Sequence, residues 1–406
     1  MMSTRQKKQP VKQIIDSTAT PPPPLCGWSD LNKDVLRIIF RKLKDHDSHD
    51  NNNNTIYRCG NVCVSWQSVA RSILPQYLLL LSNEGIFEDQ NFNLKNKNSC
   101  FLFNLFTKRV GKISLPEELK GRRFNASSFG WLLTISIESP HEIALINPFS
   151  PDQKIELPDT TKIINMFNAE RREFSNFNRE LRVISSTNPL DPNCVFVAVD
   201  GDSFESTPAF CKLGDESWTI MSKLLWRVCT DVRFHKGKFY AVDLNGNLLS
   251  VHLNSLSSDD CIDCLVPESP KYRNINYLVE LNDDLLLVGR RRVLTTLYEI
   301  TVGFDVYKWI QDEKRWSDRV EDIGNNVILL GKYSSIAIPV GHPLKVICDG
   351  GDLKANSIYF IDDVRCWRSK HHNDAGLYNM ASRKIDWRPK CWPIWISPVN
   401  WLRPML

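Results

Sequence analysis

The chain has 406 residues, of which 42% are hydrophobic and 10% aromatic, so it can bury one large core and a smaller second one. Its 51 Lys and Arg residues face 47 Asp and Glu residues, which gives a formal charge of +4. This near-neutral balance gives no case for nucleic acid as the main partner.

The 12 cysteines are irregularly spaced, and the N-terminus is polar and basic without the apolar core of a secretory signal. No run of about 18 apolar residues predicts a membrane span. We therefore expect no membrane partner and a location in the nucleus, the cytoplasm or both. The cysteines are expected to act mostly as small buried hydrophobic side chains.

The N-terminal segment, residues 1–24, is polar and ends in four prolines, Pro21 to Pro24. Consecutive prolines favour an extended, solvated backbone, so we predict a disordered tail here. The first folded element is expected to begin at residue 25.

Two short amphipathic helices are predicted between residues 25 and 74. From Trp28 to Leu43, one helical stripe is apolar and consists of Val35, Leu36, Ile39, Phe40 and Leu43. A second helical stretch runs from Asn61 to about Ser72, after a polar loop at 45–54. Neither helix can bury its apolar face alone, so they must pack on each other, on a third helix or on a partner protein.

From residue 77 onward the sequence alternates between short apolar runs and clusters of Gly, Asn, Asp and Pro, which predicts strands joined by turns. Turn residues such as Asn245-Gly246 and Asn282-Asp283 lie at the ends of these runs. Residues 162–180 form the one segment that favours a helical or loop insertion. The predicted strands include 77–81, 100–106, 131–137, 142–146, 194–199, 238–242, 248–252, 285–288, 305–310, 327–330 and 357–361.

A turn followed by an apolar strand recurs mostly at intervals of about 40–65 residues, close to the length of a four-stranded propeller blade. Trp218 and Trp316 each follow a charged turn, and we predict that they lie on equivalent outer strands. The predicted fold is a small all-α module followed by a large all-β propeller of six or seven blades over residues 77–398, with a tail at 399–406. A large β-sandwich array is the alternative.

No set of residues in the sequence predicts catalysis, a cofactor or a metal site. GxSxG, Walker, HExxH and Rossmann motifs are all missing. Cys261 and Cys264 have CxxC spacing without a second pair, and neither His371-His372 nor the polar loop at 45–54 has an evident set of further ligands. We therefore expect a protein that is not an enzyme.

Residues 28–70 resemble an F-box. That pattern begins with Leu-Pro, has an Ile/Leu-Phe pair in its first helix and has a Val-Cys-x-x-Trp run in its last helix. Leu31, Ile39-Phe40, Val62-Cys63 and Trp66 stand at those places. Asn32 replaces the proline, and since it does not pre-set the backbone angle of the turn, we expect a slightly weaker module.

The rest of the chain is similar to plant F-box proteins that carry a KIB-type β-propeller. The resemblance implies a three-helix F-box at 25–74 and a KIB-type propeller at 77–398, and it covers nearly all of residues 28–398. It is carried by Gly111–Glu117, Ser127-Ser128-Phe129-Gly130-Trp131-Leu132-Leu133, Leu145–Phe149, Asn356–Asp363 and Pro393–Pro398.

This resemblance implies the substrate-recognition subunit of a Skp1–cullin–F-box (SCF) ubiquitin ligase. The F-box would bind a Skp1-like adaptor and through it a cullin, while the propeller would hold an unknown target protein for ubiquitination by other subunits. The expected adaptor-binding residues are Leu31, Val35, Leu36, Ile39, Phe40, Val62, Cys63 and Trp66.

Two other readings stay open. One is a non-ligase interaction module whose helices pack on the propeller, and the other is an enzyme on a propeller scaffold. Basic segments such as Arg290–Arg292 fit either a target contact or ordinary surface, so the sequence assigns no target-binding residue.

Overall fold

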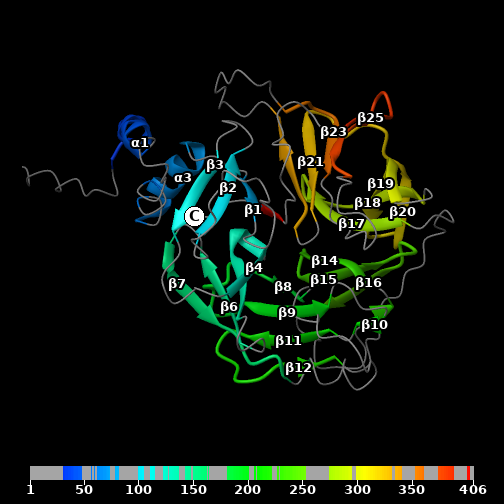
Figure 1. The fold of residues 1–406 in the computed structure, drawn as a ribbon, viewed down its shortest axis with the longest axis horizontal. Coiled ribbons are helices and arrows are strands. Elements are labelled where there is room, and N and C mark those ends of the chain that lie inside the picture. The colour runs from blue at the N-terminus through cyan, green and yellow to red at the C-terminus, as the bar shows by residue number, and fades with distance from the viewer. Residues whose placement is uncertain are drawn as a thin grey trace, which may run out of the picture.

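The computed structural model places a helical region ahead of a series of strands that closes into a ring (Figure 1). Among the residues described, no helix is long and apolar enough to cross a membrane. The structure describes residues 31–47, 56, 59, 62–73, 78–81, 99–104, 110–114, 122–126, 128–136, 142–147, 150–161, 163, 181–200, 205–206, 208–221, 226–227, 229–252, 274–294, 299–331, 334–340, 353–360, 374–387 and 400–402.

The helices whose bounds the structure describes in this region are α1 (Lys33–Asp47) and α3 (Val64–Ile73), and they lie against each other. Asn32 caps α1, because its Oδ1 accepts a hydrogen bond from the backbone N–H of Asp34 at 2.8 Å. The residue that departs from the F-box pattern therefore supplies a helix cap. This bond offsets part of the weakening that we expected from the missing proline.

Four sheets contain the N-terminal part of the strand region and the final strand. The first has the order β26-β1-β2-β3, from Asn400–Leu402, Leu78–Leu81, Ser99–Asn104 and Val110–Ser114. The second has the order β4-β5-β6-β7, from Arg122–Ala126, Leu132–Ser136, Ile143–Asn147 and Ser150–Glu156. The third has the order β12-β11-β9-β8, from Thr219–Ile220, Ala209–Lys212, Val195–Asp200 and Leu181–Ser185. A small sheet pairs β10 (Glu205–Ser206) with β13 (Trp226–Arg227).

Three further sheets complete the strands that the structure describes. One has the order β14-β15-β16, from Cys229–His235, Lys238–Asp243 and Leu248–His252. The next has the order β17-β18-β19-β20, from Asn274–Leu281, Asp284–Leu294, Glu299–Ile310 and Arg315–Arg319. The last has the order β22-β21-β23-β24-β25, from Ile336–Pro339, Asn326–Leu330, Ser357–Phe360, Gly376–Asn379 and Lys384–Trp387.

The larger sheets follow one another around a common centre (Figure 1). Strands β26, β4, β8, β14, β17 and β22 each form one edge of their sheet, and each lies against the next in that order. This radial arrangement is that of a propeller and not of a β-sandwich array. Apolar side chains fill the space between neighbouring sheets, as in the cluster of Val288, Phe304, Ile328 and Phe360.

The final strand corrects one predicted boundary. We expected residues 399–406 to be a tail outside the propeller, but residues 400–402 form β26. Leu402 lies opposite Leu78 and Asn400 opposite Leu80, so the end of the chain pairs with the first strand of the ring. A strand of three residues is too short to show the alternation of polar and apolar residues by which strands are predicted from sequence.

One predicted turn is confirmed by its backbone angles. In the hairpin of β17 and β18, Asn282 and Asp283 both have positive φ, 50° and 63°, between the paired Leu281 and Asp284. A two-residue turn with both φ values positive matches the twist of the strands that it joins, and Asn and Asp tolerate it better than most residues. The turn chemistry therefore sets this register.

Trp316 lies on the outer strand of its sheet, as predicted, and Trp218 lies next to the outer strand of another sheet. Trp218 directly precedes β12, and Trp316 lies within β20. Both indole N–H groups donate to a backbone carbonyl of the preceding sheet region, to Pro158 at 2.8 Å and to Gly246 at 3.2 Å. The repeated sequence feature therefore performs a repeated task, the joining of adjacent sheets at their outer side.

The Ser-Ser-Phe-Gly-Trp segment also joins two sheets. Phe129 has a left-handed backbone (φ 56°, ψ 28°), followed by Gly130 with φ 75°. This tight turn places Ser128 beside β8, where its Oγ accepts a hydrogen bond from the Ser185 backbone N–H at 3.0 Å.

Of the predicted insertion at 162–180, only residue 163 lies among the described residues.

Candidate protein-docking surfaces and buried polar networks

The expected adaptor-binding residues divide into a buried and an exposed group. Leu36 and Phe40 are fully buried, together with Val69 and Ala70 of α3. The Phe40 ring packs edge-on against the Trp66 ring, with the centroids 5.6 Å apart. Leu36 and Phe40 thus hold the helices together from inside, and placing them on an outward-facing docking surface was wrong.

The outer side of the helix pair exposes aliphatic side chains. Val35 is 44% exposed, Ile38 56% and Val62 59%. Leu31, Ile39, Cys63 and Trp66 are half-buried. Sequence reasoning missed Ile38, although it lies three residues after Val35 and hence on the same side of α1. These aliphatic side chains are free to contact a partner protein in the isolated chain.

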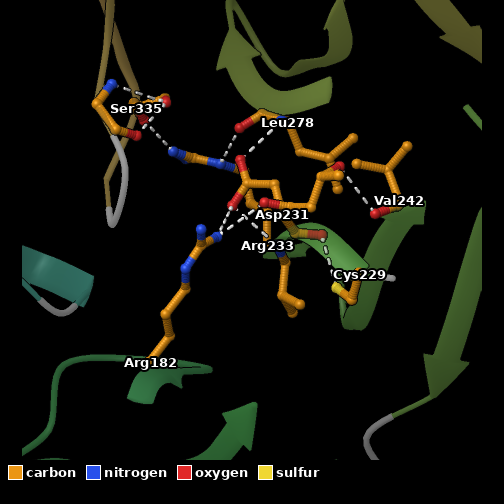
Figure 2. A network of polar contacts seen from close by, with 10 residues as sticks. Arg182, Cys229, Asp231, Arg233, Val242, Leu278 and Ser335 are labelled. Carbon is orange, nitrogen blue, oxygen red and sulfur yellow. Dashed lines mark hydrogen bonds and ion pairs between the residues drawn. The ribbon is translucent and has the colours of Figure 1, made fainter. Parts of the chain in front are cut away.

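A network of charged groups joins β8, β14 and β17, each of which forms an edge of its sheet (Figure 2). Arg182 of β8 lies 3.5 Å from the carboxylate of Asp231 of β14 and donates to the Thr230 carbonyl at 2.9 Å. Asp231 also accepts from the backbone N–H of Leu278 of β17 at 2.8 Å. Arg233 donates to the carbonyls of Leu278 and Ser335. The network thus connects four neighbouring strand segments.

Burial governs the electrostatics of this network. It raises the pKa of the Asp231 carboxyl, and Arg182 and the N–H of Leu278 oppose the rise. Burial likewise lowers the pKa of the Arg233 guanidinium, against the pull of Asp231. Because these groups bond to one another and to carbonyls of adjacent sheets, we read the network as support for the ring.

A second buried network corrects the reading of Arg290 as surface. Arg290 is fully buried and donates to Asp374 Oδ2 at 2.8 Å. Its Nε donates to Thr301 Oγ1 at 2.7 Å, and its guanidinium lies 4.9 Å above the Phe360 ring. The sequence shows three consecutive arginines, and no pattern in it shows that the first faces the neighbouring sheet.

The described residues contain no group of three or more His, Cys, Asp or Glu side chains placed to hold a metal ion. The CxxC pair at Cys261 and Cys264 and the pair His371-His372 lie outside the described residues. Most of the polar loop at 45–54 lies outside them as well.

The radial sheets define a β-propeller protein. A family model described as the KIB1-4 beta-propeller matches residues 92–379, well over half of the chain. The chain belongs to the KIB1-4 beta-propeller family. The match includes the Ser-Ser-Phe-Gly-Trp turn and both networks of buried arginines.

Relatives in Arabidopsis thaliana extend the similarity to the helices. The F-box protein SKIP23 is 24% identical over 404 residues, covering 89% of this chain and 91% of the relative. A second F-box protein is 24% identical over 359 residues, covering 83% and 96%. An F-box/kelch-repeat protein is 22% identical over 414 residues, covering 93% and 98%. The predicted resemblance to plant F-box proteins with a KIB-type propeller is confirmed.

Proposed function

We propose that this protein is the substrate-recognition subunit of an SCF ubiquitin ligase. Its helices would bind a Skp1-like adaptor and through it a cullin, and its propeller would present a target protein to subunits that transfer ubiquitin. The proposal is supported by relatives named F-box proteins that cover most of both chains. The observation that carries it is the exposed aliphatic surface of the short helix pair.

The adaptor contact that we propose is narrower than the one expected from sequence. Val35, Ile38 and Val62 form its exposed part, flanked by the half-buried Leu31, Ile39, Cys63 and Trp66. Covering apolar surface is worth about 25 cal/mol per Å², so a few such side chains contribute several kcal/mol to association. Leu36 and Phe40 act indirectly, because they hold α1 against α3.

The proposed architecture is an F-box at residues 25–74 and a propeller of six blades that reaches to residue 402. Six sheets each contribute one edge strand to the series in which neighbouring sheets lie against each other, and this supports six blades. A location in the nucleus, the cytoplasm or both remains part of the proposal, since an SCF ligase would act there.

Co-purification with a Skp1-type adaptor tests the function. We expect wild type to bind, and Val35→Asp with Ile38→Asp to weaken binding at least tenfold, because two charges would be buried without partners. Leu190→Asp is the matched control, since Leu190 is an exposed aliphatic residue (49%) of the propeller. Equal binding by the double variant and wild type, or no binding by wild type, would overturn the proposal.

The alternative, a module whose helices only pack on the propeller, makes a different prediction. Deleting residues 28–74 would then lower the melting temperature of the propeller. The ligase proposal expects the propeller transition to change little after this deletion, because the apolar face of the helices is reserved for the adaptor.

A further inference from the structure

Strands β18 and β19 extend beyond the rest of their sheet. Strand β17 pairs with β18 only as far as Asn274 opposite Arg291. Beyond that point, residues 292–294 pair with residues 299–301 and with no other part of the chain that the structure describes. On the other side, β20 begins to pair with β19 only at Tyr307. We refer to residues 291–294 and 299–303 as the ribbon.

The base of the ribbon is fixed to the next sheet by buried polar groups. The Thr301 backbone N–H donates to Asp374 Oδ1 at 3.1 Å, and its Oγ1 donates to Oδ2 at 2.7 Å. Arg290 joins the same carboxylate from the neighbouring strand. Four buried hydrogen bonds within and around this cluster hold the ribbon in one orientation. A surface fixed in this way loses little conformational entropy when it binds.

The surface of the ribbon combines aliphatic side chains with a guanidinium. The Val293 side chain is 50% exposed and the Val302 side chain 42%. Arg292 and Thr301 lie opposite each other in the ribbon, and each valine directly follows one of these two residues in the sequence. The register of β18 and β19 shifts at this point, so Val302 is an extra residue on its strand. Such a bulge redirects side chains from the sheet face. Two branched aliphatic residues are therefore presented on a projecting element.

Arg291 lies beside these valines with donors to spare. Its side chain is 32% exposed, and among the described residues its one partner is Asp305, 3.1 Å from Nε. The guanidinium passes over Gly303, where a Cβ would come within 2.6 Å of Nη2. The glycine and the buried Asp305 thus hold the guanidinium in place from behind. A planar guanidinium held so is suited to binding a carboxylate with two parallel hydrogen bonds.

Neighbouring charges also favour an acidic ligand. Arg291 and Arg319 both pair with Asp305, and Arg319 and Arg383 both pair with Glu321. Three guanidinium groups therefore face two carboxylates, and Asp305 is buried while the arginines are partly exposed. Among these five described side chains, the guanidinium groups outnumber the carboxylates by one.

We propose that the ribbon binds an extended segment of the target protein in which an Asp or Glu side chain lies between aliphatic residues. Arg291 receives the carboxylate, while Val293 and Val302 contact the aliphatic side chains. This assignment rests on the proposed function, because it takes the bound segment to belong to the protein that is ubiquitinated.

The test uses a fluorescein-labelled peptide, Gly-Ser-Val-Val-Glu-Val-Val-Ser-Gly, and anisotropy measured on the full chain bound to its adaptor. We expect binding to weaken at least tenfold in Arg291→Gln and in the pair Val293→Ser with Val302→Ser. Arg291→Lys restores the charge without the planar fork, so we expect partial recovery. The matched controls are Arg315→Gln, at an exposed ion-paired arginine that begins β20, and Leu190→Ser.

A second peptide with Gln in place of Glu isolates the carboxylate contact. It should bind wild type more weakly than the Glu peptide does, and the two peptides should bind Arg291→Gln equally. Equal binding of the Glu peptide to wild type and Arg291→Gln would overturn the assignment, as would no measurable binding to wild type. Adaptor co-purification is recorded for every variant, so loss of the adaptor contact is distinguishable from loss of the ribbon contact.

Discussion

Buried arginines mark where one sheet meets the next. Arg290 is fully buried, and its charge is matched by the Asp374 carboxylate across the sheet boundary. Taking such a pair out of water costs several kcal/mol for each ion, which mutual attraction and further hydrogen bonds must offset. Removing one member of the pair alone should therefore lower the stability of the propeller.

Asp374→Ala should destabilise the propeller by about 3–5 kcal/mol, because it leaves the Arg290 guanidinium buried and uncompensated. The measurement is the shift of the propeller transition in urea. Asp386→Ala is the control, since Asp386 lies in the same sheet in an exposed pair with Lys354 and should change stability by less than about 0.5 kcal/mol. Arg290→Met added to Asp374→Ala should recover part of the loss, and a loss that instead increases would contradict this reading.

The cysteines differ in reactivity because they differ in burial. Burial raises the pKa of the Cys229 thiol to about 12, and it also raises the pKa values of Cys194 and Cys211. Thiolate is the reactive form, so at pH 8 these three thiols are almost entirely protonated and slow to react. Cys63 is half-buried on the helix pair.

Alkylation with iodoacetamide at pH 8, mapped by mass spectrometry, should therefore modify Cys63 long before Cys194, Cys211 and Cys229. At higher pH the order of reaction should stay the same, because burial limits access to Cys194, Cys211 and Cys229. Bound adaptor should slow the reaction of Cys63 at least tenfold. Unchanged labelling of Cys63 in the complex would place the adaptor contact elsewhere.

At the scale of elements, two tryptophans on or next to outer strands perform equivalent tasks. Trp218 and Trp316 each donate an indole hydrogen bond to a carbonyl of the preceding sheet region. Trp316 also stacks edge-on against Trp309, with the ring centroids 5.2 Å apart. A repeated fold needs such links between repeats, because each sheet contacts only its neighbours.

Trp218→Phe and Trp316→Phe keep most of the aromatic packing but leave the Pro158 or Gly246 carbonyl without its donor. Each should cost about 1–3 kcal/mol, the penalty for a buried acceptor without a partner. Trp387→Phe is the control, since Trp387 is 43% exposed on an outer strand. Thermal melts of the three variants measure the difference. Equal effects in all three would mean that ring volume, and not the hydrogen bond, matters.

The sequence predicts elements better than it predicts their surroundings. The Asn282-Asp283 turn and the outer strand of Trp316 were predicted correctly, because turn angles and local repeats depend on neighbouring residues. Strands β18 and β19 were predicted too short, because strand 285–288 extends to Leu294 and strand 305–310 begins at Glu299. The predicted strand ended where the apolar run gives way to three arginines. Arg290 nevertheless lies within β18, and its guanidinium is paired with the Asp374 carboxylate, far along the chain.

The helix pair shows the same limit. A stripe of apolar residues predicted an amphipathic α1, but periodicity alone does not distinguish the side chains that face α3 from those that remain exposed. Leu36 and Phe40 point inward, whereas Ile38, outside the predicted stripe, is exposed. Asn32 was expected to weaken the first turn and proves to cap it. The outcome in each case depends on the packing partner.

At the scale of the whole molecule, the two ends of the folded chain meet in one sheet. Strand β1 begins soon after α3 ends at Ile73, and it pairs on its inner side with β26, which is near the C-terminus. The sheet that closes the ring is thus also the sheet from which the helix pair extends. The position of the proposed adaptor surface relative to the propeller therefore depends on this closure.

Deleting residues 400–406 should open the ring, because β1 keeps its pairing with β2 but loses β26, and β4 loses the strand against which it lies. We expect the propeller to melt at least about 5 °C lower, since a loss of 1 kcal/mol shifts a domain of this size by about 2–4 °C and several backbone hydrogen bonds are lost. Deleting residues 403–406 keeps β26 and should leave the melting temperature unchanged. Trp401→Pro, which removes a strand donor within the full-length chain, should lower it as the longer deletion does. Identical melting of the two deletions would show that β26 does not close the ring, and the helix pair would then need another element to fix its position.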